Sequence, residues 1–230
     1  MSEFLTDSIF FGAIICLVSY EIGLILKRKF RLALLNPLLI GTVCVIAVLM
    51  LLKTEYSQFQ ESAKYLGYLL TPATVCLAIP LYQQAELLKR NFKAIAGGIA
   101  AGVFTSLFSV FLLSKLFFLN HEQYVTMLPK SITTAIGMDV SKELGGIETI
   151  TVAVIIITGI LGNILAEFVC KLFRIQEPIA KGIAIGASSH AIGTVKAMEI
   201  GETEGAMSSL AIAVAGLITV LGASFFANLI

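Results

Sequence analysis

Long apolar stretches without charge recur along the whole chain. Uninterrupted runs of this kind cover residues 32–52, 65–85, 94–114 and 205–230. Two further runs, 8–26 and 149–166, are interrupted or followed by a single glutamate. Because a helix needs about 20 apolar residues to cross the hydrocarbon core, the pattern predicts about six full transmembrane helices. The weaker, interrupted segments 124–146 and 178–198 predict two broken or re-entrant helices.

Composition supports this interpretation and excludes several classes of protein. Apolar residues make up 57% of the 230 residues and charged residues only 13%, whereas about a quarter of a soluble domain is charged. The net charge of +1 provides no basic excess for nucleic-acid phosphates. The sequence therefore predicts an all-α polytopic membrane protein. Its loops leave no room for a soluble domain, so residues 1–230 form a single transmembrane domain.

Lysine and arginine in short loops indicate which side faces the cytoplasm. The densest basic cluster, 27–31, predicts a cytoplasmic first loop and an N-terminus on the other side. The clusters 89–93 and 171–181 are also cytoplasmic if segment 124–146 enters the membrane and returns. Whether segment 178–198 crosses or re-enters stays open. The acidic start, with the basic cluster after the apolar run, argues against a cleavable signal peptide.

One internal similarity appears when the sequence is aligned with itself at an offset of 57 residues. It places Pro72 over Pro129 and Gly102 over Gly159, and it suggests repeat units 72–118 and 129–175. Each unit opens with proline, meets a second helix breaker and leads into a full span. This order is typical of a discontinuous helix followed by a scaffold helix in transporters. The sequence alone does not indicate whether the two units have opposite orientations.

Broken helices survive in a membrane only where they line a cavity enclosed by protein. The segment around Ser188, Ser189 and His190 is the most informative, because an ionisable side chain lies within an apolar stretch. Histidine could take up and release a proton during transport, and Thr194 adds a further hydroxyl. The alternative is that His190 only bonds a neighbouring helix and that the small residues serve packing.

Hydroxyls, a lysine and the N-termini of broken helices together would bind a small carboxylate. From the other broken segments, the candidates are Thr74, Lys130, Ser131, Thr133 and Thr134 for substrate and Asp139 for proton coupling. Structural alternatives exist for these side chains. Threonine often bonds its own helix, and the lysine and aspartate could lie at the water interface.

No catalytic pattern is present, so the sequence does not predict an enzyme. Ser188 and Ser189 have no evident acidic partner for a triad with His190. The four cysteines lie in apolar stretches without metal-ligand spacing and are interpreted as small buried hydrophobes. Nothing indicates a metal or an organic cofactor.

Four stretches of sequence resemble the LrgB/CidB family of membrane proteins. They are residues 70–82, 128–139, 186–194 and 204–210. The resemblance covers nearly the whole chain. It implies either a holin/antiholin-like protein that regulates murein hydrolase export and lysis, or a carrier of small monocarboxylates such as glycolate, glycerate or pyruvate. It also implies a small four-span partner of the LrgA/CidA type.

The broken segments and His190 favour the carrier, because a lesion-forming pore has little use for them. We therefore expect a proton-coupled carrier of small monocarboxylates in the bacterial inner membrane, oligomeric and without a nucleic-acid partner. The holin-like protein is the alternative. A membrane scaffold that only assists its partner is a third class.

Overall fold

The computed structural model describes residues 8–30, 35–76 and 78–230, without the side chains of residues 70, 71, 74, 80 and 81. All regular structure in these ranges is α-helical, which confirms the all-helical part of the predicted fold class. The chain divides into two compact units, Met1–Cys76 and Leu77–Ile230. The helices of the first unit are α2 (Phe11–Phe30), α3 (Pro37–Leu52), α4 (Tyr56–Gly67) and α5 (Leu70–Cys76).

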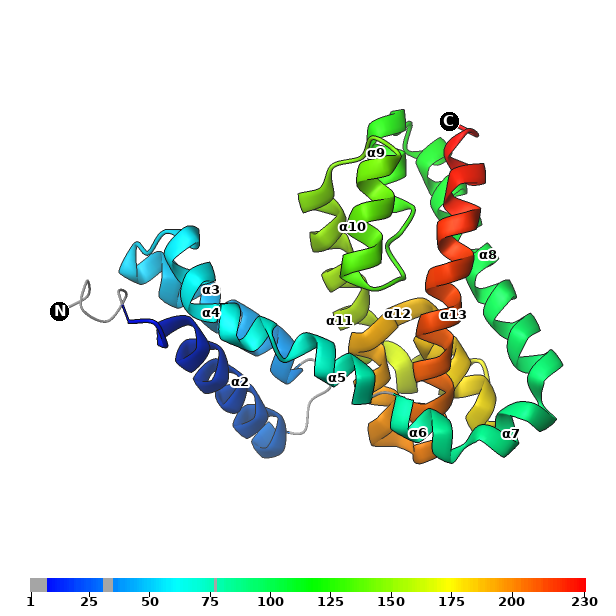
Figure 1. Ribbon diagram of the computed structural model, residues 1–230, viewed down its shortest axis with the longest axis horizontal. Coiled ribbons are helices and arrows are strands. Elements are labelled where there is room, and N and C mark those ends of the chain that lie inside the picture. The colour runs from blue at the N-terminus through cyan, green and yellow to red at the C-terminus, as the bar shows by residue number, and fades with distance from the viewer. Residues whose placement is uncertain (1–7, 31–34, 77) are drawn as a thin grey trace. The chain divides into compact units, whose positions relative to one another are not determined.

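The second unit carries the longer helices (Figure 1). They are α6 (Ala78–Gln83), α7 (Ala85–Arg90), α8 (Phe92–Leu116), α9 (His121–Met127), α10 (Thr134–Glu143), α11 (Glu148–Leu172), α12 (Pro178–Ile200) and α13 (Glu202–Ala227). Within the described ranges, α8, α11 and α13 are long and apolar enough to cross a membrane, and α3 is a shorter apolar helix.

Segment 65–85, predicted as one span, contains a turn at residues 68 and 69, between α4 and α5. Pro72 lies in the first turn of α5, directly after this turn. Proline is tolerated there because the first N–H groups of a helix lack an internal partner, but it cannot continue a preceding helix. Pro72 therefore accounts for the interruption of this apolar run before α5.

In the first unit, α2 packs against α3 and α4 at two glycines. The backbone N–H of Gly12 donates to Ser62 Oγ at 2.9 Å. A β-carbon at Gly23 would lie 2.8 Å from the carbonyl oxygen of Pro37. A side chain at either glycine would collide with the neighbouring helix, so the two glycines determine where the helices cross.

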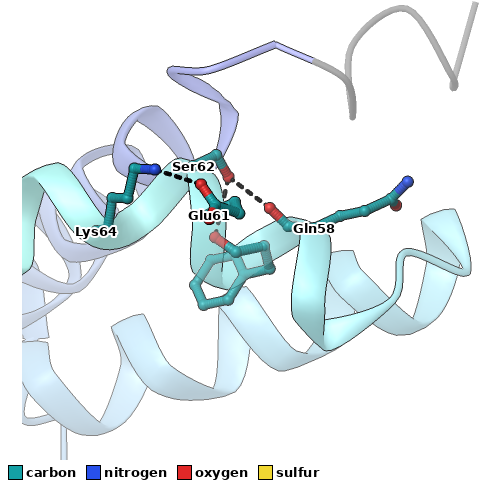
Figure 2. A network of polar contacts seen from close by, with 5 residues as sticks. Gln58, Glu61, Ser62 and Lys64 are labelled. Atoms are coloured by element: carbon teal, nitrogen blue, oxygen red, sulfur yellow. Dashed lines mark hydrogen bonds and ion pairs between the residues drawn. The ribbon is translucent and has the colours of Figure 1, made fainter.

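The α4 helix adds polar contacts of its own, shown in Figure 2. Ser62 Oγ donates to the carbonyl oxygen of Gln58 at 3.2 Å, one turn earlier. Glu61 and Lys64 form an ion pair on the exposed surface, and the hydrogen bond with Glu61 raises the pKa of Lys64. An exposed pair of this kind adds little stability, so α4 is held mainly by its contact with α2.

In the second unit, α12 is interrupted in its middle. His190 has φ 42° and ψ −142°, outside the helical region. Before this residue, α12 runs parallel to α13. A β-carbon at Gly182 would lie 2.5 Å from the carbonyl oxygen of Glu204, and one at Gly186 would lie 2.4 Å from that of Ser208.

After the interruption the direction reverses. Thr194 Oγ1 lies 2.7 Å from Ser208 Oγ, and the side chain of Met198 packs against Gly205. In these two contacts, higher residue numbers in α12 lie beside lower residue numbers in α13, so the two segments are antiparallel. Residues 178–200 therefore fold back on themselves as a re-entrant hairpin, which we call hairpin B.

A second hairpin is formed by α9, the connection 128–133 and α10. The backbone N–H of Ile147, just beyond α10, donates to Thr126 Oγ1 in α9 at 2.8 Å. Nearer the connection, a β-carbon at Gly137 would lie 3.5 Å from the carbonyl oxygen of Pro129. The two arms are thus antiparallel, and we call residues 121–143 hairpin A.

The two hairpins enter from opposite ends of α13. At the C-terminal end, Tyr124 of hairpin A donates its hydroxyl hydrogen to the carbonyl oxygen of Phe226 at 2.9 Å; Figure 1 shows α9 beside this end. At the N-terminal end, Lys181 of hairpin B lies 4.0 Å from Glu204. Both tips therefore point toward the middle of the unit.

We predict that Gly186→Ala lowers the free energy of unfolding by about 1–3 kcal/mol, because its β-carbon would lie within 3 Å of Ser208 and Ala211. Gly97→Ala in α8 is the matched control. Nothing lies within 4 Å of its β-carbon, so alanine there should leave stability unchanged or raise it by up to about 1 kcal/mol. Thermal unfolding in one detergent measures both, and equal shifts would contradict the close packing of hairpin B.

Candidate functional site

A cavity of about 730 Å³ lies between α8, the tip of hairpin A and the first arm of hairpin B. One wall is made of small residues of α8, among them Gly98, Ala101 and Gly102. Polar side chains gather at its inner end. They are Thr105, Ser106, Ser109, Lys130, Ser131 and Ser188. The volume is in the range of small-molecule binding sites.

Hydroxyl groups connect α8 to the tip of hairpin A. Lys130 Nζ donates to Ser131 Oγ at 3.1 Å, and Ser131 Oγ lies 3.0 Å from Ser106 Oγ. An ammonium group has three N–H donors, so Lys130 keeps capacity to donate to a ligand. The arrangement can therefore offer a positive charge and hydroxyl hydrogens to one small anion.

The charges of the cavity are separated along α8. Asn91 and Glu177 lie at the outer end, at the starts of α8 and α12. Ser106, which contacts the tip of hairpin A, is 15 residues further along α8, or about 22 Å at the helical rise. A carboxylate at the mouth and an ammonium group inside would draw an anion toward the inner end.

Three of the predicted site residues, Lys130, Ser131 and Ser188, line this cavity. The others from hairpin A do not. Thr133 is the N-cap residue of α10, Thr134 begins that helix, and Asp139 is exposed. Thr74 lies in α5, but its side chain is outside the described part of the chain.

The remaining predicted residues of hairpin B, Ser189, His190 and Thr194, are buried against neighbouring helices. His190 Nε2 lies 2.9 Å from the carbonyl oxygen of Ile155 in α11. Because a carbonyl oxygen only accepts, Nε2 carries the hydrogen in this contact. Thr194 contacts α13, and Ser189 shares a contact with Ser188 at 3.0 Å.

Tight packing closes the side of hairpin B that faces α11. A β-carbon at Gly159 would lie 2.6 Å from His190 Cε1, and one at Gly162 would lie 1.7 Å from Ser189 Oγ. Asn163 Nδ2 donates to a backbone carbonyl oxygen of the same hairpin at 2.8 Å. Both tips therefore border the cavity, through Lys130 and Ser131 of hairpin A and Ser188 of hairpin B, but the other side of hairpin B is held against α11.

The sequence analysis missed the contribution of α8. Thr105 and Ser106 lie three and four residues after Gly102, and Ser109 lies one turn further along, at the spacing of one helical face. That spacing of hydroxyls in an apolar helix is the signal that could have found them. No sequence pattern identifies Glu177 as a site residue, because only the fold places it beside the start of α8.

The described residues contain no group of three histidine, cysteine, aspartate or glutamate side chains that could hold a metal ion. Ionised side chains near the hairpins instead pair with one another. Lys196 pairs with Glu167 of α11 and with Glu199, and Lys142 lies 3.6 Å from Glu148. The cavity with Lys130 is therefore the arrangement best suited to bind a ligand.

The chain matches the LrgB-like family over residues 16–229. It is 37% identical over 226 residues to "Antiholin-like protein LrgB" of Bacillus subtilis strain 168, covering 98% of each chain. It is 37% identical over 206 residues to "Holin-like protein CidB" of Staphylococcus aureus strain Mu50, covering 90% of each. "Antiholin-like protein LrgB" of Bacillus cereus strain B4264 is 35% identical over 213 residues, covering 92% of this chain and 93% of the relative. No solved structure is significantly similar.

The long apolar helices define a helical membrane protein, and two helical hairpins border a cavity within it. Its sequence places it further: the chain belongs to the LrgB-like family, as its four motifs predicted. The printed names of the relatives describe holin-like and antiholin-like proteins and no enzyme.

We predict that water fills the cavity. In a variant whose native cysteines are replaced by serine, Thr105→Cys should react with a membrane-impermeant thiosulfonate reagent. Thr219→Cys, on the buried face of α13, is the control and should stay unmodified. Mass spectrometry of the labelled protein measures both positions, and equal reaction at the two would argue against an accessible cavity.

Proposed function

We propose that this protein is a carrier of small monocarboxylates, of the glycolate, glycerate and pyruvate class, in the bacterial inner membrane. The observation that carries the proposal is the cavity at the tips of two re-entrant hairpins, which holds Lys130 among hydroxyl groups. Discontinuous helices that meet near the membrane midplane are how many carriers form substrate sites. In this proposal the anion binds between hairpin A, hairpin B and α8.

The chemistry of the inner end suits a carboxylate. Its two oxygens would accept hydrogens from the ammonium group of Lys130 and from the hydroxyl of Ser131 or Ser106. A charge-assisted hydrogen bond of this kind is shorter and stronger than a neutral one. Gly102 and Ala187 border the cavity without bulky groups and leave room for a short carbon chain.

Alternating access would use the opposed hairpins. The α8 and α11 helices are both 25 residues long, and their starts are 56 residues apart. Two residues beyond each helix, at Phe118 and Arg174, the backbone has φ 55°, and a hairpin follows. At the same offset the tripeptide Ala-Ile-Gly occurs in both hairpins, at 135–137 and 191–193. We infer that α8 with hairpin A and α11 with hairpin B are inverted repeats, in a different phase from units 72–118 and 129–175.

If the repeats are inverted, the difference in packing between hairpins A and B represents one of two alternating states. Hairpin A contacts α8 beside the cavity through Ser131 and Ser106, whereas hairpin B is packed on Gly159 and Gly162 of α11. Exchanging these two arrangements would open the site to the opposite side. A protein that alternates between them carries out saturable exchange and never forms a continuous channel.

Proton coupling is assigned to His190 in this proposal. Its backbone forms the tip of hairpin B, and its Nε2–H bonds the carbonyl oxygen of Ile155. A second proton, added at Nδ1, would place a positive charge in the packed contact with α11. That charge would favour release of the tip, so protonation and opening would be linked. Asp139, exposed on α10, is the second predicted proton-coupling residue and is tested in the same way.

The names of the relatives favour a second candidate. They describe holin-like and antiholin-like proteins, which suggests a role in controlling murein hydrolases and lysis beside a small LrgA/CidA-type membrane protein. A pore would release large solutes without saturation. A carrier would exchange small carboxylates, with or without that partner, and could influence lysis through the solutes that it moves.

We predict that the purified protein in proteoliposomes performs counterflow of labelled glycolate or pyruvate while a trapped dye is retained. Lys130→Gln should raise the half-saturation concentration at least about tenfold, because a charge-assisted hydrogen bond of about 1.5–3 kcal/mol is lost. Lys142→Gln is the control, since this lysine is exposed on α10 outside the cavity. Each measurement is made with and without the small partner.

Dye loss without saturation would contradict the carrier and favour the holin-like candidate. Exchange only in the presence of the partner would make the two-chain complex the functional unit. Equal kinetics for the Lys130 variant and its control would remove the lysine from the substrate site and leave transport itself intact.

We predict that His190→Gln abolishes accumulation driven by an imposed pH gradient and preserves exchange at equal pH. Glutamine can still donate to the carbonyl oxygen of Ile155 but does not titrate, so it separates the hydrogen bond from the proton. His190→Ala loses both and should also lower stability. If the glutamine variant still accumulates substrate as the native protein does, His190 has only a structural role.

A further inference from the structure

A second cavity, of about 500 Å³, lies at the C-terminal end of α11. It is bounded by the last turn of α11, by the connection to hairpin B and by both ends of that hairpin. Cys170 and Ile200 lie within it, and Lys171, Arg174 and Lys181 line it. It has no residue in common with the cavity of the proposed transport site.

Positive charge is in excess in this second cavity. Its one lining carboxylate, Glu167, is already paired with Lys196, and Lys181 lies 4.0 Å from Glu204. Within the described residues, Lys171 and Arg174 have no carboxylate at ion-pair distance. Two of the three cations are therefore available to an anion.

The fold does not require these cations. At the equivalent end of α8, Lys115 corresponds to Lys171 at the 56-residue offset, but Phe118 stands where α11 is followed by Arg174. Both helix ends have the same backbone, with φ 55° at this residue. The backbone conformation of Arg174 after α11 is thus formed by Phe118 after α8. This conformation therefore does not require an arginine.

Apolar side chains beside the cavity indicate what kind of anion it holds. Phe168, Leu172 and Phe173 on the last turns of α11 are 62%, 61% and 69% exposed. A phosphate ion would leave them unused. A phospholipid would cover them with its acyl chains while its phosphate meets the cations. Basic pockets at the cytoplasmic ends of transmembrane helices bind anionic headgroups in this way.

We propose that this cavity binds the headgroup phosphate of an anionic phospholipid, through Lys171 and Arg174 with Lys181 beside them. The binding is a property of the membrane-embedded chain and does not depend on the proposed transport activity. Placement of the cluster on the cytoplasmic side follows the excess of lysine and arginine in this loop.

Native mass spectrometry of the delipidated full-length chain tests the proposal, with phosphatidylglycerol, phosphatidylcholine and inorganic phosphate as probes. Phosphatidylglycerol should bind, and the double variant Lys171→Gln/Arg174→Gln should bind it at least about tenfold more weakly. Lys115→Gln, at the opposite end, is the matched control and should bind it like the native chain. Phosphatidylcholine should bind no better to the native chain than to the double variant.

Three results would overturn the proposal: an equal loss in the Lys115 variant, equal binding of phosphatidylcholine, or displacement of the lipid by inorganic phosphate. The last would make the cavity a site for a soluble anion. Melting temperatures without lipid check that the double variant is folded, and Arg174→Gln alone replaces it if it is not. Counterflow is not a readout here, so failure of this site and failure of the carrier are distinguishable.

Discussion

The interactions that enclose the two hairpin tips are the constraint on which the rest of the fold depends. In hydrocarbon, each backbone N–H and C=O must find a partner within the protein, and a chain that reverses inside the membrane exposes several of them. At hairpin B, Asn163 and Thr194 donate to backbone carbonyl oxygens of the tip. Close packing covers the rest: Gly182 and Gly186 bring the hairpin onto α13, and Gly159 and Gly162 bring α11 onto its tip. Removing this packing would leave the reversal at His190 without cover.

That enclosure also separates the polar side chains into two groups. Those that face neighbouring helices have partners, as His190 has in Ile155 and Thr194 has in Ser208. Lys130 lines the cavity, and within the described residues its ammonium group donates to a hydroxyl. A membrane protein would not keep an ammonium group with spare donors at the inner end of a cavity for stability alone. The second group therefore carries the proposed function, and the first holds the hairpins that present it.

Periodicity and breakers were sufficient to predict the helical membrane class and the two interrupted segments, because apolar length and proline or glycine placement act locally. They placed Lys130, Ser131 and Ser188 among the candidates, and these three share the cavity. They could not separate Ser188 from Ser189, since adjacent residues face different helices only after the hairpin has folded. Thr105, Ser106 and Ser109 were missed because an apolar helix with a few hydroxyls resembles an ordinary span until a second element lies opposite them.

A holin-like lesion, which the names of the relatives suggest, and the proposed carrier would require different movements of the same hairpins. A lesion forms when helices separate and turn polar faces toward a shared pore, which would leave the tip of hairpin B without its contacts on Gly159 and Gly162. A carrier keeps one tip packed at every stage and moves only one barrier at a time. In the proposed carrier, the present arrangement, with both tips beside the cavity and hairpin B packed on α11, would be one of the two alternating states. Under that scheme, an effect on lysis would reach the cell wall through the carboxylates that cross the membrane.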